Sequence, residues 1–165
     1  MLQVNFDVHH LQLGTKIPDT AAIVPPDTVN YTHYDNDAWY ALLMVGLDFP
    51  ATKDKPYKAP YQHWAVGSIH EDQFLSGECL INYEWTAAPY KKGKHRVVFL
   101  IYREPDKEEL WKNWGNNIEA PRTYFNTTKF STKYRLGDPV AVNFFIADIK
   151  EDHKSRPIEA SPHDC

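Results

Sequence analysis

The amino-acid sequence predicts a mostly β protein, folded as a two-sheet β-sandwich with one or two short helices. Short apolar runs rich in β-branched and aromatic residues recur along the chain, and Pro, Gly and charged residues separate them. Only one segment combines helix formers with both a start and a stop signal. The pattern predicts roughly seven to nine strands, which is enough to form two sheets packed over one core.

Three apolar runs are expected to form the centre of the larger sheet. They are Tyr40–Val45, Ala65–Ile69 and Val97–Tyr102. The first belongs to an almost continuous apolar run, Trp39–Val45, which is typical of a strand buried on both faces. Val97–Tyr102 has the same character, so it is the second strong candidate for a central strand.

The other expected strands have a weaker pattern. Val4–Leu13 is half alternating and predicts one strand or a pair of short strands. Thr28–Tyr34 alternates apolar with polar residues, as a strand with one polar face does. Gly77–Tyr83 and Val140–Ile149 complete the set of expected strands.

Three segments are expected to lie outside the sheets. Thr15–Thr20 is predicted to be an extended connection, because Pro18 cannot donate a ladder hydrogen bond. Lys107–Asn113 carries helix formers and follows Asp106, which can cap a helix, so we expect a short surface helix there. Phe49–Gln62 contains three prolines, and a loop of this length is more often functional than a mere connection.

Length and charge restrict the organisation and the classes of function. The 165 residues fit one domain over 1–149, followed by a polar, proline-broken tail over 150–165. The formal net charge is −4 without a long basic block, so a broad nucleic-acid-binding surface is not predicted. No apolar run reaches the roughly 18 residues of a membrane span, and the first residues do not resemble a signal peptide. We therefore expect a soluble chain.

Two cysteines and two glycosylation acceptor sequences bear on the compartment. Cys79 and Cys165 are too few for a disulfide framework, and Cys79 is expected to be a small buried residue. Asn30 and Asn126 each open an Asn-x-Thr triplet, which would accept a glycan if the chain were secreted. The compartment stays open, with a cytoplasmic or secreted location favoured over a mitochondrial one.

A carboxylate, two histidines and an arginine stand at the ends of the expected central strands. Asp48 follows the first apolar run, His63 precedes the second, and His95 and Arg96 precede the third. If those strand ends converge, the four side chains line one pocket. Several N–H donors in a concave, low-dielectric place suit an anionic oxygen such as that of a phosphate.

Short motifs surround these residues. They are an Asp-x-Pro at Asp48, a His-Trp at His63, a Gly-x-His-Arg that ends at Arg96, and the run Leu-Gly-Asp-Pro-Val-Ala-Val-Asn-Phe-Phe that begins at Leu136. In this order and spacing, the motifs resemble those of the phosphatidylethanolamine-binding protein (PEBP) family over nearly the whole chain.

The resemblance implies two packed sheets with a small ligand cavity at one end. It also implies that a set of residues forms or frames a site for a phosphate headgroup. The matching positions in this chain are Asp48, Pro50, Tyr57, His63, Pro89 and His95. Tyr61 and Arg96 match supporting positions beside that site. The family has a cis peptide just before this histidine segment, so the Ala59–Pro60 bond is expected to be cis.

Several positions depart from the family pattern. Gly46 stands where an acidic residue is usual, Gln62 replaces the first of two histidines, and Tyr61 replaces a tryptophan. Structural roles also stay open for the site residues. Both histidines could be core residues hydrogen-bonded to a carbonyl group or to Asp48, and Asp48 could fix a turn through backbone N–H groups.

Two functions from different classes stay open. The first is a module that binds a small anion or phospholipid headgroup and regulates a protein partner such as a kinase or a protease, as family members do. The second is a structural subunit of the mitochondrial large ribosomal subunit, in contact with ribosomal proteins and rRNA, because a protein of that particle resembles the same family. No nucleophile elbow, zinc-ligand spacing or phosphate-binding glycine loop occurs, so neither enzymatic activity nor a metal or cofactor is expected.

Overall fold

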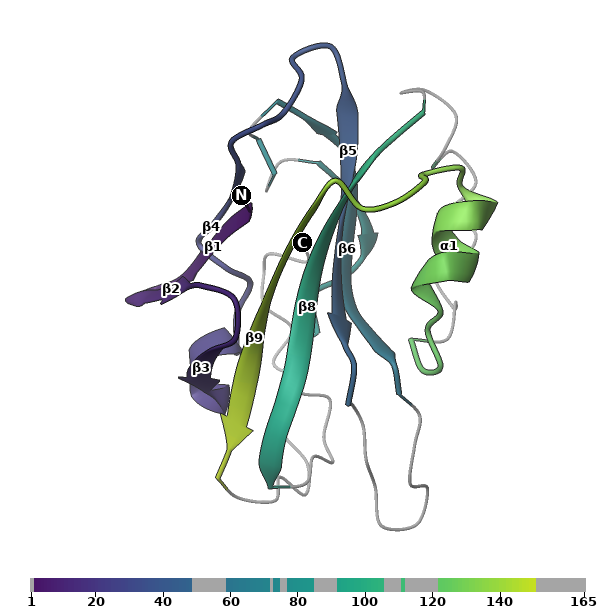
Figure 1. The fold of residues 1–165 in the computed structure, drawn as a ribbon. Helices are drawn as coiled ribbons and strands as arrows, with labels where there is room; N and C mark the ends of the chain where they lie inside the picture. The colour runs from purple at the N-terminus through teal and green to yellow at the C-terminus, as the bar shows by residue number, and fades with distance from the viewer. Residues whose placement is uncertain are drawn as a thin grey trace.

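The computed structural model describes residues 2–48, 59–71, 73–74, 77–84, 92–105, 111 and 122–150. These residues form a mostly β fold with two sheets (Figure 1). The elements in chain order are β1 (Leu2–Phe6), β2 (His9–Leu11), β3 (Thr15–Pro18), the 3-10 helix η1 (Asp19–Ala22), β4 (Thr28–Tyr31), β5 (Trp39–Gly46), β6 (Tyr61–His70), β7 (Glu78–Ile81), β8 (Gly93–Arg103), α1 (Thr127–Lys133) and β9 (Ala141–Ile149).

The larger sheet has six strands in the order β3-β9-β8-β5-β6-β7. All neighbours are antiparallel except the edge strand β3, which runs parallel to β9. β5 pairs with β6 on one side and with β8 on the other, and all of its residues after Trp39 are buried. The uninterrupted apolar character of this strand follows from its central place, because both of its faces are covered.

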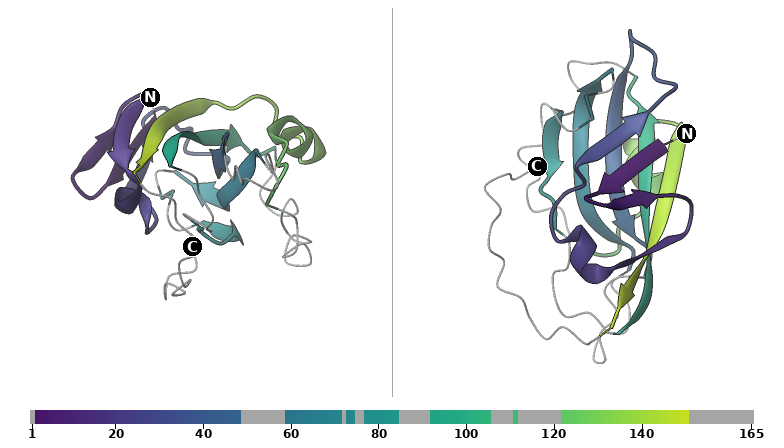
Figure 2. Two further views of the ribbon diagram at one scale, coloured as in Figure 1. Left: turned by 90° about the horizontal axis from the view of Figure 1, so that it is seen from below. Right: turned by 90° about the vertical axis from the view of Figure 1, so that its left-hand side faces the viewer.

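The smaller sheet has the strand order β2-β1-β4 and covers one face of the larger sheet (Figure 2). Val4 of β1 lies opposite Leu11 on β2 and Val29 on β4, and all three are buried. Phe6 joins the two layers, with its ring 5.8 Å from that of Phe145 on β9. Burial of one such side chain contributes about 1.5–3 kcal/mol, so these contacts are the main attraction between the sheets.

A polar contact also fixes how the small sheet sits. Asn143 on β9 is 3% exposed, and its Nδ2 donates to the carbonyl oxygens of Leu2 at 2.9 Å and Leu11 at 3.1 Å. The amide therefore satisfies two carbonyl groups of the small sheet inside the core. A buried polar group of this kind is costly without partners, so the contact favours one alignment of the two layers.

The opposite face of the larger sheet carries α1 (Figure 2). Phe130 of this helix stacks on Trp111, with ring centroids 6.1 Å apart. Trp111 in turn lies against the backbone of Gly67 on β6, where a Cβ atom would approach its Nε1 to 2.4 Å. Only glycine therefore fits at that position of β6.

The structure confirms the mostly β class, the two packed sheets and the three central strands. The Ala59–Pro60 peptide bond is cis, as predicted. Val4–Leu13 forms the second of its two predicted arrangements, a pair of short strands. The strand predicted over Thr28–Tyr34 is shorter and ends at Tyr31.

Two further predictions are wrong, and a third cannot be compared with the structure. Thr15–Pro18 is a strand, because an edge position lets proline occupy its last residue without loss of a ladder hydrogen bond. Cys79 is exposed, because it lies in the exposed first half of the edge strand β7, whose second half, Leu80 and Ile81, is buried. The predicted helix Lys107–Asn113 lies outside the described residues apart from Trp111.

The described α-helix, Thr127–Lys133, lies outside the segment for which a helix was predicted. It starts after Asn126, whose side-chain oxygen accepts a hydrogen bond of 2.8 Å from the backbone N–H of Lys129. Asparagine is a favoured residue at this capping position, because it satisfies an N–H group that the helix leaves unpaired.

Candidate functional site

The candidate site lies at one end of the larger sheet. Gly46, the last residue of β5, pairs with Tyr61 at the start of β6 and with Val97 near the start of β8. Because these strands are antiparallel neighbours, the end of β5 and the beginnings of β6 and β8 meet at the same edge. The strand ends that carry the predicted site residues therefore converge, and Gly46 places no side chain between them.

One cluster at this end consists of Asp48 and Arg96. Asp48 Oδ2 accepts hydrogen bonds of 2.9 Å from both the backbone N–H and the Nε of Arg96, and Oδ1 accepts one of 2.8 Å from a terminal nitrogen of the same guanidinium. These hydrogen bonds lower the pKa of the Asp48 carboxyl. Asp48 therefore ties the end of β5 to β8, and the guanidinium of Arg96 is held by a carboxylate of the chain itself.

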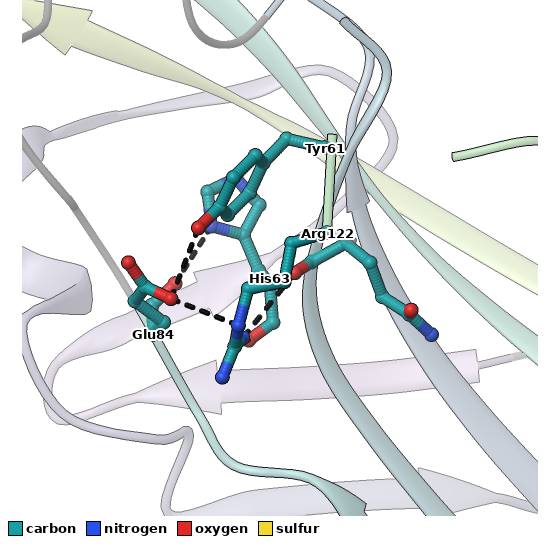
Figure 3. A network of polar contacts seen from close by, with 5 residues as sticks. Tyr61, His63, Glu84 and Arg122 are labelled. Carbon is teal, nitrogen blue, oxygen red and sulfur yellow. Dashed lines mark hydrogen bonds and ion pairs between the residues drawn. The ribbon is translucent and has the colours of Figure 1, made fainter. Parts of the chain in front are cut away.

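A second cluster consists of Tyr61, His63, Glu84 and Arg122 (Figure 3). The Tyr61 hydroxyl donates to Glu84 Oε2 at 3.0 Å, and Arg122 Nε lies 3.0 Å from the same oxygen. Burial and the nearby carboxylate both raise the pKa of Tyr61, so this phenol stays protonated and acts as a donor. Two donors from different segments thus converge on one carboxylate oxygen.

His63 lies at the base of this second cluster and is fully buried. Its Nδ1 is 2.7 Å from the backbone carbonyl oxygen of Glu84, while the Glu84 backbone N–H donates to the carbonyl of His63 at 2.9 Å. Burial lowers the pKa of His63 to about 4, so the ring is neutral at pH 7. Because a carbonyl only accepts, Nδ1 carries the proton and Nε2 of the neutral ring is an acceptor.

Arg122 is held by backbone groups as well as by Glu84. One terminal guanidinium nitrogen donates to the carbonyl oxygens of His63 at 3.0 Å and Gln62 at 3.3 Å. The Gln62 backbone N–H returns a bond of 2.8 Å to the carbonyl of Arg122, and Thr123 forms an isolated bridge with Tyr61. The segment that carries Arg122 is thus pinned along the start of β6.

The predicted site residues divide into four groups. Tyr61 and His63 belong to the second cluster, and Arg96 and Asp48 form the first. His95 is buried on β8, and its proximity contributes to the lowered pKa of Asp48. The remaining predicted positions, which lie outside the described residues, are Pro50, Tyr57 and Pro89.

Glu84 and Arg122 are the two site residues that the sequence did not indicate. Neither residue is among the predicted site residues. A signal was present at Glu84, since a single acid follows an apolar strand and stands between Tyr83 and Trp85. Its partner could not be named, because the contact joins segments far apart in the sequence.

Metal and membrane sites can be considered for the described part of the chain. No three or more His, Cys, Asp or Glu side chains of the described residues gather as metal ligands would. None of the helices in this part of the chain has the length and apolar character that a membrane crossing requires.

Solved structures share this fold. The carboxypeptidase Y inhibitor, solved in complex with its cognate proteinase, matches with a TM-score of 0.70 at 22% identity, over 90% of this chain and 83% of the inhibitor. A phosphatidylethanolamine-binding protein from Plasmodium vivax matches with a TM-score of 0.68 at 21% identity, over 92% of this chain and 85% of that protein. The fold is therefore that of a PEBP-like β-sandwich.

Curated proteins that are similar in sequence support the same family assignment as the fold does. A 26 kDa secreted antigen of Toxocara canis is 33% identical over 76% of this chain, CEN-like protein 4 of Nicotiana tabacum is 34% identical over 67%, and Protein TERMINAL FLOWER 1 of Arabidopsis thaliana is 32% identical over 68%. The chain spans 48% to 60% of the length of these relatives. No model of a known protein family matches the chain. The chain belongs to the PEBP family, as a divergent member.

Proposed function

We propose that the chain is a binding module, without enzymatic activity, that holds an oxyanion at the Tyr61 and Arg122 cluster and regulates a protein partner. The oxyanion is the phosphate group of a small anion or of a phospholipid headgroup. One observation carries this proposal: a phenol and a guanidinium converge on a single carboxylate oxygen. An oxygen of a phosphate presents the same kind of acceptor, and charge-assisted hydrogen bonds to it are strong.

The surroundings of the cluster also fit a binding site. The Arg122 and Glu84 side chains are 24% and 21% exposed, so solvent reaches a site whose walls are otherwise buried. Electrostatic interactions are stronger in such a partly buried place than at the open surface. His63 adds a buried ring whose protonation would supply a further donor to an anion.

A protein partner is proposed from the related structures. The carboxypeptidase Y inhibitor shares the fold and is seen in complex with a proteinase, which favours a protease over a kinase as the partner of this chain. The alternative role as a ribosomal subunit has no observation of its own in the described residues. Cosedimentation of the purified chain with ribosomal large subunits would favour that alternative.

Titration calorimetry at fixed salt tests the anion site. Inorganic phosphate and glycerophosphoethanolamine separate a free phosphate from a lipid headgroup as the source of the ligand. We expect His63→Ala to weaken binding by about 1–3 kcal/mol, as the loss of a charge-assisted hydrogen bond does, and His95→Ala tests whether the buried ring on β8 takes part as well. His10→Ala on the small sheet is the matched control. Unchanged affinity in both site variants would leave the two histidines structural.

The pH dependence of binding supplies a second readout. A phosphate next to His63 stabilises the protonated ring, so the pKa of His63 rises from about 4 when the anion binds. Binding then takes up a proton, and the affinity for glycerophosphoethanolamine, whose phosphodiester keeps one negative charge over this range, should rise as the pH falls from 7 toward 5. Calorimetry in buffers of different ionisation enthalpy measures this uptake, and an affinity that is independent of pH would remove His63 from the site.

A further inference from the structure

The donors of the proposed oxyanion site are occupied by the chain's own carboxylate. Tyr61 Oη and Arg122 Nε both approach Glu84 Oε2 to 3.0 Å. Figure 3 shows both contacts ending on the same oxygen, at the side of the cluster away from the backbone of His63. Glu84 thus stands where an oxygen of a bound anion would lie if these donors served it.

We propose that Glu84 is an internal competitor that determines the affinity and specificity of this site, so that an external anion binds only by displacing its carboxylate from Tyr61 and Arg122. The inference rests on the proposed function, because it concerns the same anion site. It assigns to Glu84 an autoinhibitory role that a purely structural ion pair would not have.

The contacts allow such an exchange, because the donors are fixed while the carboxylate can rotate. Arg122 is held in place by the carbonyl oxygens of His63 and Gln62, independently of Glu84. The Glu84 backbone is also fixed, by reciprocal hydrogen bonds with His63. The Glu84 side chain is partly exposed, so rotation about its own bonds can bring the carboxylate into water. Displacement therefore needs no movement of a strand.

The charge of the competitor predicts which anions can replace it. Glu84 carries one negative charge, so a singly charged anion exchanges like for like and gains little. A doubly charged phosphate monoester gains more from Arg122 than the carboxylate does, because the attraction scales with the charge. The site should therefore favour inorganic phosphate or a phosphate monoester over a phosphodiester such as glycerophosphoethanolamine.

Calorimetry on four forms of the full chain tests the inference. Inorganic phosphate is titrated into the natural chain, Glu84→Gln, Glu84→Gln combined with Arg122→Gln, and the control Glu78→Gln on β7. We expect Glu84→Gln to bind phosphate about 10- to 100-fold more tightly, since a charged competitor for two charge-assisted bonds is removed. The control should keep the natural affinity, and the double variant should lose the gain.

The outcomes distinguish a failure of this inference from a failure of the proposed function. If the natural chain binds phosphate and Glu84→Gln binds it equally or more weakly, Glu84 is no competitor and the proposed function still stands. If neither the natural chain nor Glu84→Gln binds phosphate, the proposed oxyanion site itself is wrong.

A ligand-free measurement checks that the variant acts as intended. Glu84 contributes to the raised pKa of Tyr61, so Glu84→Gln should lower the pH at which the Tyr61 phenol ionises. NMR of the Tyr61 ring follows this titration, and Glu84→Ala serves as a second variant if the glutamine form does not fold. An unchanged titration in a folded variant would show that Glu84 does not engage Tyr61 in solution and would overturn the inference.

Discussion

Two arginine–carboxylate pairs lie at the same end of the larger sheet. They differ in the segments that they join, in the exposure of their side chains and in how the carboxylate oxygens are shared. The Asp48–Arg96 pair joins neighbouring segments of the sheet, and its side chains are 32% and 58% exposed. The Glu84–Arg122 pair joins distant segments, and its side chains are 21% and 24% exposed. The first pair uses both carboxylate oxygens for one arginine, whereas the second shares one oxygen between an arginine and a tyrosine.

The difference indicates that the two pairs have different roles. Exposed pairs are screened by water and contribute little to stability, so Asp48–Arg96 mainly sets the geometry of a strand end. The Glu84–Arg122 pair lies above a fully buried histidine and binds backbone carbonyl groups as well. Loss of one partner there would leave polar groups without partners in a partly buried place, which is costly.

The largest expected effect therefore comes from Arg122→Gln. The change leaves the Glu84 carboxylate without its cation and removes the donor to two carbonyl oxygens, and we expect a loss of about 3–4 kcal/mol in the free energy of unfolding. Arg96→Gln is the matched control and should cost less than about 1 kcal/mol. Urea unfolding followed by circular dichroism measures both. Equal losses for the two variants would break the distinction between the pairs.

Glu104 can be compared with the carboxylates of these two pairs. It is a buried carboxyl group that is in contact with no arginine of the described residues. Glu104 is 4% exposed, and its Oε1 accepts hydrogen bonds of 2.8 Å from the Ser68 backbone N–H and from Trp111 Nε1. Its Oε2 is buried and has no hydrogen-bond partner among the described residues. Burial raises the pKa of Glu104 to about 7, whereas the arginine lowers the pKa of Asp48.

The sign of the resulting pH dependence follows from proton binding. Between pH 4.5 and 7 the folded state holds a proton on Glu104 that the unfolded state has released, so stability falls as the pH rises through this window. We expect roughly 2–3 kcal/mol to be lost between pH 4.5 and pH 8. Glu104→Gln should remove this part of the slope, and the difference between the two unfolding curves isolates it. A slope that is unchanged in Glu104→Gln would contradict the buried, protonated state.

Much of the fold was predictable from the sequence, because the central strands have strong local signals. The continuous apolar run that became β5 is possible only where both faces of a strand are covered. The helix α1 was not predicted, because Thr127–Lys133 contains mostly residues with low helix propensity. Burial of Phe130 against Trp111 and the cap at Asn126 stabilise it, and the first of these is a tertiary contact.

The sequence predicted the first cluster of the site, Asp48 and Arg96, better than the second. Asp48 and Arg96 lie at ends of adjacent strands, so their proximity follows from the strand pattern and the family motifs. The contact between Glu84 and Arg122 depends on the return of a distant segment along β6, where Thr123 bridges Tyr61. No local pattern encodes that return, and an isolated acid or arginine in a sequence is most often a surface residue.

The smallest expected effect concerns the coupling within the exposed pair. A double-mutant cycle of Asp48→Asn and Arg96→Gln should give a coupling energy of about 0.5–1 kcal/mol at pH 7 and low salt. Arginine lowers the pKa of Asp48, so this contribution is present above the ordinary pKa of an aspartate and is lost as the pH falls through the lowered value. The coupling should also shrink when salt is raised, because both side chains reach solvent. A coupling above about 2 kcal/mol that persists in high salt would mean that Asp48 and Arg96 behave like the partly buried pair, and the contrast between the two clusters would be lost.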